Sequence, residues 1–421
     1  MFKKTFLKNG LGVFLFPMKS TEAVTVLFLV RTGSKYETKK LNGISHLLEH
    51  MLFRGTKKWP DSTTLSKKLD GVGGFYNAFT DKEMLGIIIK VGAENLSLAV
   101  EAVGEMVRQP LLGLADLAKE KKTIIEEINM REDNPQVAVL DFWEELLYGE
   151  QPAGWPVIGE KEIVMAISRQ DLFRHLRSFF VGENSLMAIA GNFKEKEARA
   201  IIGKNLAGLV RDQKKPKPGV EEKQSHPSFA SRFKETDQTH LCLGVRGFDA
   251  FSPQRHVLDL IAAILGGMMS SRLFIEVREK RGLAYYLRTF TENYTDTGYL
   301  VTHLGVNRQR VSDATRIICR EYRELKTKKI GRAELTKAKE SIRGHFRLGL
   351  ETSDQFASFF GLQGILGKKV LTPEEEWREI AKITQDDILK VAREVFRSDQ
   401  LNLALIGPRQ EEKKILKILK V

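Results

Sequence analysis

Two histidines and a glutamate within five residues form a pattern that can bind a metal ion. His46 and His50 are four residues apart, with Glu49 between them in an H-x-x-E-H arrangement. On a helix this spacing places both rings and the carboxylate on one face, within reach of a single ion. A catalytic zinc ion has three protein ligands and a water, and a carboxylate beside that water can accept its proton. We therefore expect His46 and His50 to be zinc ligands and Glu49 to be the base that activates the zinc-bound water.

The positions around this pattern are almost all apolar. Leu47, Leu48, Met51 and Leu52 occupy the rest of a predicted helix over residues 43–53, which should be buried. Ionisable groups are costly to bury unless they are paired or bound to a metal. The alternative is a buried salt-bridged cluster without metal. The complete H-x-x-E-H pattern favours the metal site.

A third ligand must come from elsewhere, and residues 120–132 offer two candidates. Glu120 and Glu127 are seven residues apart, so two helical turns return them to the same face. Glu126 is turned by about 100° and is expected to face solvent. We predict that Glu127 is the third zinc ligand and that Glu120 orients one of the histidines. A surface charge with no role is the alternative for Glu120.

Two parts of the chain, 216 residues apart, repeat each other. Residues 167–180 and 383–396 align without a gap, and the register continues in residues 186–191 against 402–407. Each copy has a helix cap, an amphipathic helix and a short apolar strand that ends in glycine. The repeat predicts a duplicated lobe.

The repeat places a joint near the middle of the sequence. Residues 211–223 carry charges and prolines but few large apolar side chains, as an exposed linker does. We predict a zinc-binding catalytic lobe at 1–210, this linker, and a second homologous lobe at 224–421. The fold class is α+β, each lobe being a mainly antiparallel sheet with helices packed on one face. In the first lobe we expect strands at 13–17, 24–32, 75–80 and 83–91 and helices at 43–53, 62–69, 93–108, 114–129 and 136–148.

The metal-binding pattern belongs to a wider set of matching segments. His46–His50, followed by Glu127 with 76 residues between, resembles the pitrilysin or insulinase family of inverted-motif zinc peptidases. Residues 53–56, 73–80 and 120–127 continue the match, as do residues 270–285 in the second lobe. The resemblance implies that Arg278 and Tyr285 bind substrate. In that role Arg278 holds a carbonyl or carboxylate, and Tyr285 donates to the developing oxyanion.

The resemblance also draws attention to Asn77, Ala78 and Phe79, a strand segment that follows a glycine turn. An exposed strand edge can accept an extended peptide through backbone hydrogen bonds, with weak selection of side chains. We expect this strand to bind substrate. The alternative is a strand that is paired on both sides inside the sheet.

The expected activity is that of a zinc metalloendopeptidase acting on oligopeptides or unstructured protein segments. The second lobe has no H-x-x-E-H, and His256 stands near the corresponding helix without partners, so we expect one zinc ion per chain. The resemblance implies a homodimer in which the Arg/Tyr lobe of one chain completes the zinc site of the other. The alternatives are a non-catalytic, scaffold-like subunit and a subunit that depends on a paralogous partner.

Composition narrows the class of protein and its location. The net charge is +13, but the basic residues are spread along the chain beside acidic ones, so we expect no nucleic-acid partner. No apolar run is long enough to span a bilayer, so we expect no membrane partner. Lys8 and Gly10 interrupt the N-terminus before a signal sequence can form, which predicts a cytoplasmic protein. Cys242 and Cys319 are expected to be buried small hydrophobic residues.

Overall fold

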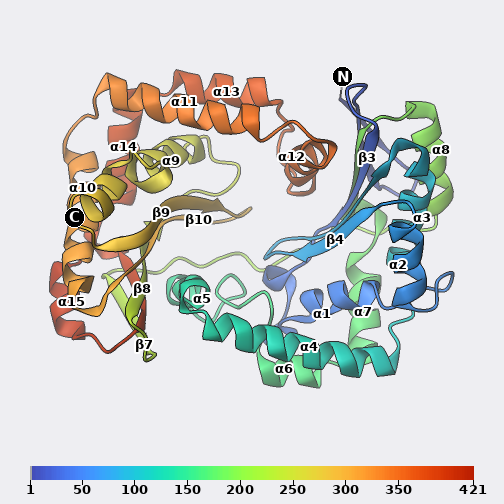
Figure 1. The fold of residues 1–421 in the computed structure, drawn as a ribbon, viewed down its shortest axis with the longest axis horizontal. Helices are drawn as coiled ribbons and strands as arrows, with labels where there is room; N and C mark the ends of the chain where they lie inside the picture. The colour runs from blue at the N-terminus through green and yellow to red at the C-terminus, as the bar shows by residue number, and fades with distance from the viewer. Residues whose placement is uncertain (1) are drawn as a thin grey trace. The chain divides into compact units, whose positions relative to one another are not determined.

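Two β-sheets organise the chain in a computed structural model that describes residues 2–421 (Figure 1). The strands are β1 (Lys3–Phe6), β2 (Gly12–Pro17), β3 (Ala23–Val30), β4 (Phe75–Thr80), β5 (Leu85–Gly92), β6 (Ser185–Gly191), β7 (Ser228–Phe233), β8 (Gln238–Arg246), β9 (Ala284–Asn293), β10 (Gly298–Asn307) and β11 (Asn402–Gly407). The first sheet has the order β1-β2-β6-β3-β5-β4, and the second has β7-β11-β8-β10-β9. Neighbouring strands are antiparallel, apart from the parallel pairs β2–β6 and β7–β11. This confirms the predicted α+β class.

Helices connect the strands in both halves of the sequence. They are α1 (Ile44–Leu52), α2 (Ser62–Asp70), α3 (Leu96–Arg108), α4 (Leu114–Asp133), α5 (Pro135–Tyr148), α6 (Lys161–Ala166), α7 (Arg169–Phe179), α8 (Glu195–Leu206), α9 (Arg255–Ala262), α10 (Val311–Thr327), α11 (Arg332–Leu348), α12 (Ser353–Ile365), α13 (Pro373–Lys382), α14 (Gln385–Val395) and α15 (Glu412–Ile418). Two π-helices, Ala263–Gly267 and Phe274–Glu279, lie between α9 and β9. Among the residues that the structure describes, no helix has the length and apolar character needed to cross a membrane.

The internal repeat extends to the order of the strands. Without β1, the first sheet reads β2-β6-β3-β5-β4, which matches β7-β11-β8-β10-β9 strand for strand. The helix caps also match, because Ser168 on α7 and Thr384 on α14 each form a capping box with an aspartate three residues on. These features confirm the predicted duplication.

The compact units of the structure are not continuous in sequence. One contains residues 1–128, 155–218 and 349–371, and the other contains the remaining segments. Helix α12 therefore belongs to the first unit, where it packs on β3 and β6, and α5 belongs to the second, where it packs on β8 and β11. The two helices occupy equivalent places in the repeat, since adding 216 to 135–148 gives 351–364, against 353–365 for α12. Each half of the sequence thus contributes one helix to the sheet of the other half.

Strand β3 lies inside the first sheet, between β6 and β5, and both of its faces are covered by apolar groups. Val24, Val26 and Phe28 belong to the cluster under α3, whereas Leu27 and Leu29 belong to the cluster under α12. All five side chains are fully buried. Burial of one such side chain contributes about 1.5–3 kcal/mol, which explains why this strand is apolar on both faces, with Thr25 as its one polar residue.

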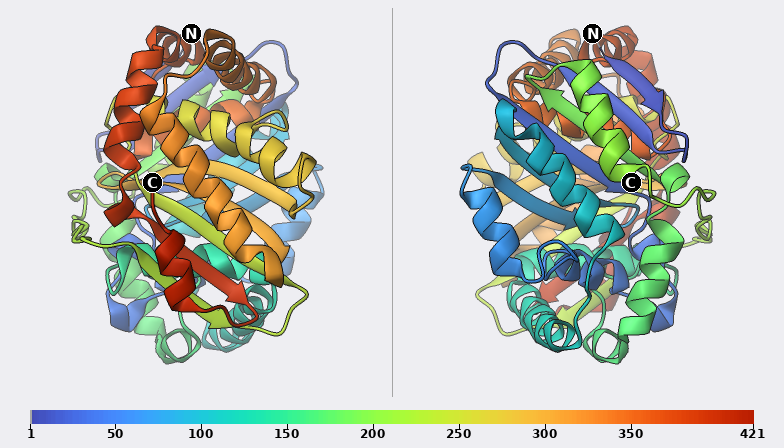
Figure 2. Two further views of the ribbon diagram at one scale, coloured as in Figure 1. Left: turned by 90° about the vertical axis from the view of Figure 1, so that its left-hand side faces the viewer. Right: turned by 90° about the vertical axis from the view of Figure 1, so that its right-hand side faces the viewer.

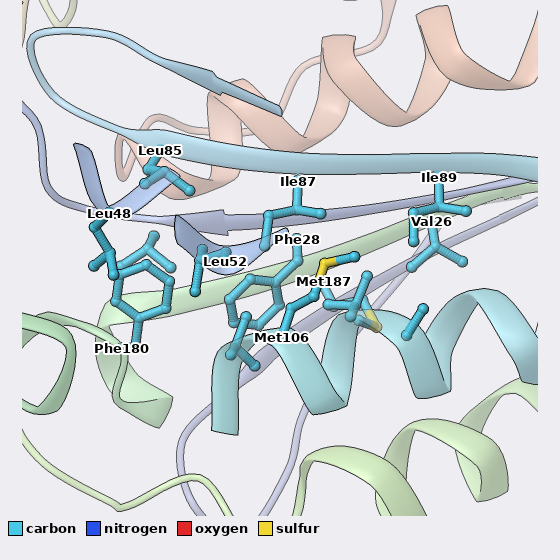
Figure 3. Close-up of a cluster of buried hydrophobic side chains, with 14 of the residues drawn as sticks. Val26, Phe28, Leu48, Leu52, Leu85, Ile87, Ile89, Met106, Phe180 and Met187 are labelled. Atoms are coloured by element: carbon cyan, nitrogen blue, oxygen red, sulfur yellow. The ribbon is translucent and has the colours of Figure 1, made fainter. Parts of the chain in front are cut away.

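The cluster on the α3 side also anchors helix α1. Figure 3 shows Val26, Phe28 and Ile87 of the sheet facing Met106 of α3, with Leu52 of α1 beside them. In Figure 2 (right), α3 and α8 lie across the strands of this sheet, and in Figure 2 (left) α10 crosses the strands of the second sheet. Helix α1 is thus held by the same core that holds the sheet.

Candidate metal centre

Helix α1 begins at a cap that is built from a glutamate outside the helix. Gly43 has φ 91°, in the left-handed region, and turns the chain into the first helical residue. The Glu37 carboxylate accepts hydrogen bonds from the backbone N–H groups of Gly43 and Ser45, at 2.8 and 2.9 Å, and from Asn42 Nδ2 at 3.0 Å. Burial raises the pKa of Glu37, whereas these hydrogen bonds lower it. The backbone N–H groups at the N-terminus of α1 therefore have an acidic hydrogen-bond acceptor, and the helix dipole also favours a negative charge at this end.

Three side chains from α1 and α4 form the only group of potential metal ligands among residues 2–421. His46, His50 and Glu127 each offer a ligand atom within 4.8 Å of the others. Glu127 Oε2 lies 3.8 Å from His46 Nε2 and 3.6 Å from His50 Nε2, and the two rings are 4.7 Å apart between centroids. All three are partly buried, with side-chain exposures of 17%, 18% and 37%.

These separations fit a tetrahedral zinc ion. They are longer than hydrogen bonds between nitrogen and oxygen, so the carboxylate does not hydrogen bond to either ring. Zinc bonds of about 2.0–2.1 Å place tetrahedral ligands about 3.4 Å apart. Two imidazoles and one carboxylate are also a donor set that catalytic zinc uses. The residues present therefore fit this metal.

Glu120 lies two helical turns before Glu127 on α4. Only 1% of its surface is exposed to solvent. Its Oε2 lies 3.0 Å from His50 Nδ1, on the side of the ring away from Glu127, and its Oε1 lies 2.8 Å from Arg54 Nη2. Glu126, between the two glutamates, is exposed and outside the ligand group. Glu120 is thus placed to orient a histidine, and Glu126 points where the helix spacing predicts.

Glu49 lies on the same helix but makes a different contact. Its Oε2 accepts a hydrogen bond of 2.5 Å from Thr80 Oγ1 at the end of β4. Burial raises the pKa of Glu49, and the Thr80 hydrogen bond opposes this rise. A raised pKa makes the carboxylate a better proton acceptor near neutral pH.

Strand β4, which carries Asn77, Ala78 and Phe79, is the last strand of the first sheet and pairs only with β5. Its other edge has no strand partner within residues 2–421. Asn77 and Phe79 are exposed, while Ala78 packs against the core. The strand therefore has the open edge that peptide addition requires.

Arg278 and Tyr285 lie in the second unit. Arg278 is on the π-helix Phe274–Glu279, and its guanidinium carbon is 4.8 Å from the Phe274 ring centroid and 5.6 Å from that of Tyr285. Tyr285 is 79% exposed, on the edge strand β9. Arg278 forms no ion pair with any described residue. Its charged guanidinium lies next to the exposed ring of Tyr285.

His256 differs from the sequence prediction. It was expected to have no partners, but its Nε2 lies 3.1 Å from Glu376 Oε2, and Arg255 lies 3.3 Å from the same carboxylate. Glu376 is on α13, more than a hundred residues further along the chain, so spacing along the helix could not reveal it. Asp259 Oδ2 on the same helix lies 4.0 Å from His256 Nδ1, but these residues are not a ligand group in the part of the chain that the structure describes.

Three residues that support the site were missed in the sequence. Thr80 stands in the Asn-Ala-Phe-Thr segment but was not singled out, and Arg54 follows His50 by four residues, a spacing that brings it to the same helix face. No sequence pattern pointed to Glu37, because its role as the cap of α1 depends on how the loop before the helix folds back onto it.

The comparisons with known proteins agree with this geometry. A family model described as Insulinase (Peptidase family M16) matches residues 13–161, and one described as the Peptidase M16 inactive domain matches residues 166–342. The uncharacterized zinc protease YmxG of Bacillus subtilis is 31% identical over 411 residues, which cover 97% of this chain and 98% of that protein. This chain belongs to peptidase family M16. An uncharacterized zinc protease of Streptomyces coelicolor is 30% identical, covering 97% of this chain and 90% of its own.

Solved structures of two bacterial proteins share the fold over nearly the full length. A protease from Helicobacter pylori superposes with a TM-score of 0.92 at 23% identity, covering 97% of this chain and 99% of that one. A peptidase M16 inactive domain protein from Pseudomonas fluorescens has a TM-score of 0.90 at 19% identity, covering 97% and 98%. The M16 match to residues 13–161 contains the whole ligand group, and the inactive-domain match contains Arg278 and Tyr285.

Proposed function

We propose that this chain is a zinc metalloendopeptidase that hydrolyses oligopeptides or unstructured protein segments. The observation that carries the proposal is the convergence of His46, His50 and Glu127 at separations that suit zinc, with the carboxylate of Glu49 on the same helix. Its relatives are named as zinc proteases, which supports the same activity.

His46, His50 and Glu127 would hold one zinc ion per chain. When bound, the ion supplies Lewis-acid chemistry, lowering the pKa of a water molecule and polarising the substrate carbonyl. Glu120 keeps the His50 ring oriented by accepting a hydrogen bond at Nδ1. No second ligand group occurs among the described residues, which supports one ion per chain.

Glu49 is the general base of the proposed reaction. Thr80 donates to its Oε2, and we assign the proton of the attacking water to Oε1, the oxygen without this contact. The same oxygen then returns the proton to the amine that leaves when the peptide bond breaks. Thr80 limits the rotation of the carboxylate, so the base does not need to be reoriented between the two transfers.

Peptide binding would use the open edge of β4. An extended substrate adds as a further strand beside Asn77, Ala78 and Phe79, where backbone hydrogen bonds provide affinity for many sequences. Arg278 and Tyr285 would bind the substrate carbonyl and stabilise the developing oxyanion. The exposure of Tyr285 and the absence of an ion pair at Arg278 support this role.

The proposed assembly is a homodimer in which the second lobe of one chain completes the zinc site of its partner. Two alternatives follow from the same family: a subunit that needs a paralogous partner, and a scaffold-like subunit without activity. The complete ligand group and the retained Glu49 favour an active chain over a scaffold.

The test is zinc-dependent cleavage by the purified protein alone. We expect about one zinc ion per chain by elemental analysis and cleavage of a fluorogenic peptide library and of an unfolded protein, but not of the same protein when folded. Removing zinc with a chelator should abolish cleavage, and one equivalent of zinc should restore it. A zinc-loaded chain that cleaves nothing would favour the scaffold alternative, and activity that needs an added paralogous chain would favour the heterodimer.

A further inference from the structure

We propose that Arg54 is a positioning residue that fixes His50 as a metal ligand by holding Glu120 in place. The inference rests on the zinc site proposed above, and it assigns a role to a side chain just beyond the end of α1. Its basis is a series of contacts between three groups, in which the Glu120 carboxylate lies between the Arg54 guanidinium and the His50 ring.

The Glu120 carboxylate has one contact for each oxygen. Oε2 lies 3.0 Å from His50 Nδ1, and Oε1 lies 2.8 Å from Arg54 Nη2 in an ion pair and accepts no hydrogen bond from the described residues. An ionised carboxylate accepts hydrogen bonds and donates none. The proton between Glu120 and His50 therefore belongs to Nδ1 of the ring.

This assignment decides which nitrogen of His50 can bind a metal. A neutral imidazole carries one proton, so a proton on Nδ1 leaves the lone pair on Nε2. Nε2 is the nitrogen that faces Glu127 Oε2, at 3.6 Å. If the ring carried its proton on Nε2 instead, this nitrogen could not bind the ion beside Glu127. The contact with Glu120 therefore prepares the ring for the ion before the ion binds.

Arg54 is what keeps Glu120 in this orientation. The carboxylate is 1% exposed, and a buried charge without a compensating cation is costly. Without the guanidinium, the carboxylate would have no contact on Oε1 and could turn away from Nδ1. Because Arg54 follows α1 and Glu120 lies on α4, the pair also ties together the two helices that supply the ligands.

Arg54 itself is 35% exposed, but its removal leaves the buried Glu120 carboxylate without a cation, so Arg54→Met should lower the melting temperature of the metal-free protein. A purely structural role would lower the melting temperature and leave the His50 tautomer and the zinc affinity unchanged. A positioning role also changes the tautomer and weakens zinc binding. These two readouts do not depend on peptide hydrolysis.

The experiment compares Arg54→Met with Arg54→Lys, which keeps the cation, and with Lys58→Met as a control. Lys58 is a nearby surface residue paired with Glu101, away from the ligands. Zinc affinity is measured by competition with a chromophoric chelator. We expect Arg54→Met to weaken zinc binding by about 10–100-fold, the effect typical of groups that orient a ligand. Arg54→Lys should recover most of the affinity, and Lys58→Met should match the wild type.

The tautomer of His50 is measured in the metal-free protein by ¹⁵N NMR of labelled histidine. We expect the wild type to carry the proton on Nδ1 and Arg54→Met to show a mixture of the two tautomers. Equal zinc affinity and equal tautomer in the wild type and Arg54→Met would overturn the proposal, as would an equal loss in Lys58→Met. A wild type that binds zinc without cleaving peptides would refute only the proposed activity, since both readouts still test Arg54.

Discussion

His175 predicts how the stability of the first unit depends on pH. The ring is buried between α7, α1 and the end of β3, with Nε2 at 2.8 Å from Thr32 Oγ1 and 3.2 Å from Ser45 Oγ, and it packs on Phe179. Burial lowers the pKa of His175 to about 3 in the folded protein. In the unfolded chain a histidine titrates near pKa 6.5.

The sign and size of the effect follow from this difference in pKa. At pH below about 6.5 the unfolded chain binds a proton that the folded protein does not, so stability is full above this pH and falls as the pH decreases. Each pH unit costs about 1.4 kcal/mol until the pH approaches 3. Between pH 7 and pH 5 the loss from His175 alone is therefore about 2 kcal/mol.

The assay is urea unfolding of the wild type and His175→Gln at pH 7 and pH 5. Other groups also titrate in this interval, so the quantity of interest is the difference between the two proteins in their loss of unfolding free energy. The wild type should lose about 2 kcal/mol more than the variant. His226→Gln, at an exposed histidine, is the control and should behave as the wild type does. Equal losses in wild type and His175→Gln would refute the reasoning.

Three further predictions concern the zinc ligands, the assembly of the chains and the packing of helix α12. Glu127→Gln should lower zinc occupancy sharply, whereas Glu126→Gln should leave it unchanged, and the opposite result would contradict the helix phasing. Glu49→Gln and Arg278→Ala chains, each weak alone, should regain peptide hydrolysis when mixed under conditions of subunit exchange; no gain, with exchange shown by an independent label, would argue against the proposed dimer. Gly364→Val should destabilise the protein by about 1–3 kcal/mol in chemical denaturation, since a Cβ at this position of α12 would lie 2.3 Å from a Phe14 ring atom; an unchanged midpoint would contradict this packing.

Much of the metal centre could be predicted because its signals are local. The spacing of His46 and His50 and the seven-residue interval from Glu120 to Glu127 each follow from helical geometry, and the helices that carry them were predicted within a few residues of their bounds. Strand β5 was expected to begin at Glu83 but begins at Leu85, because the N–H of Asp81 donates to the carbonyl of Met84 in a turn.

The parts that could not be predicted depend on tertiary structure. The apolar stripe of α5 shows that the helix is buried, but not that it packs on β8 and β11 in the second unit. In the same way, the Glu37 cap on α1 and the pairing of His256 with Glu376 join residues whose separation along the chain follows no rule. Periodicity identifies the face that is buried, and the fold decides what covers it.

The central claim is that Glu49 activates water at a zinc site of which it is not a ligand. The most direct test measures zinc content and peptide hydrolysis together in Glu49→Gln, which preserves the size of the side chain and an oxygen that can accept from Thr80. The account predicts wild-type zinc occupancy with turnover reduced by about 10²–10⁴-fold, the usual contribution of a general base. Turnover near the wild-type rate at full occupancy would contradict it, and so would a variant that no longer binds zinc.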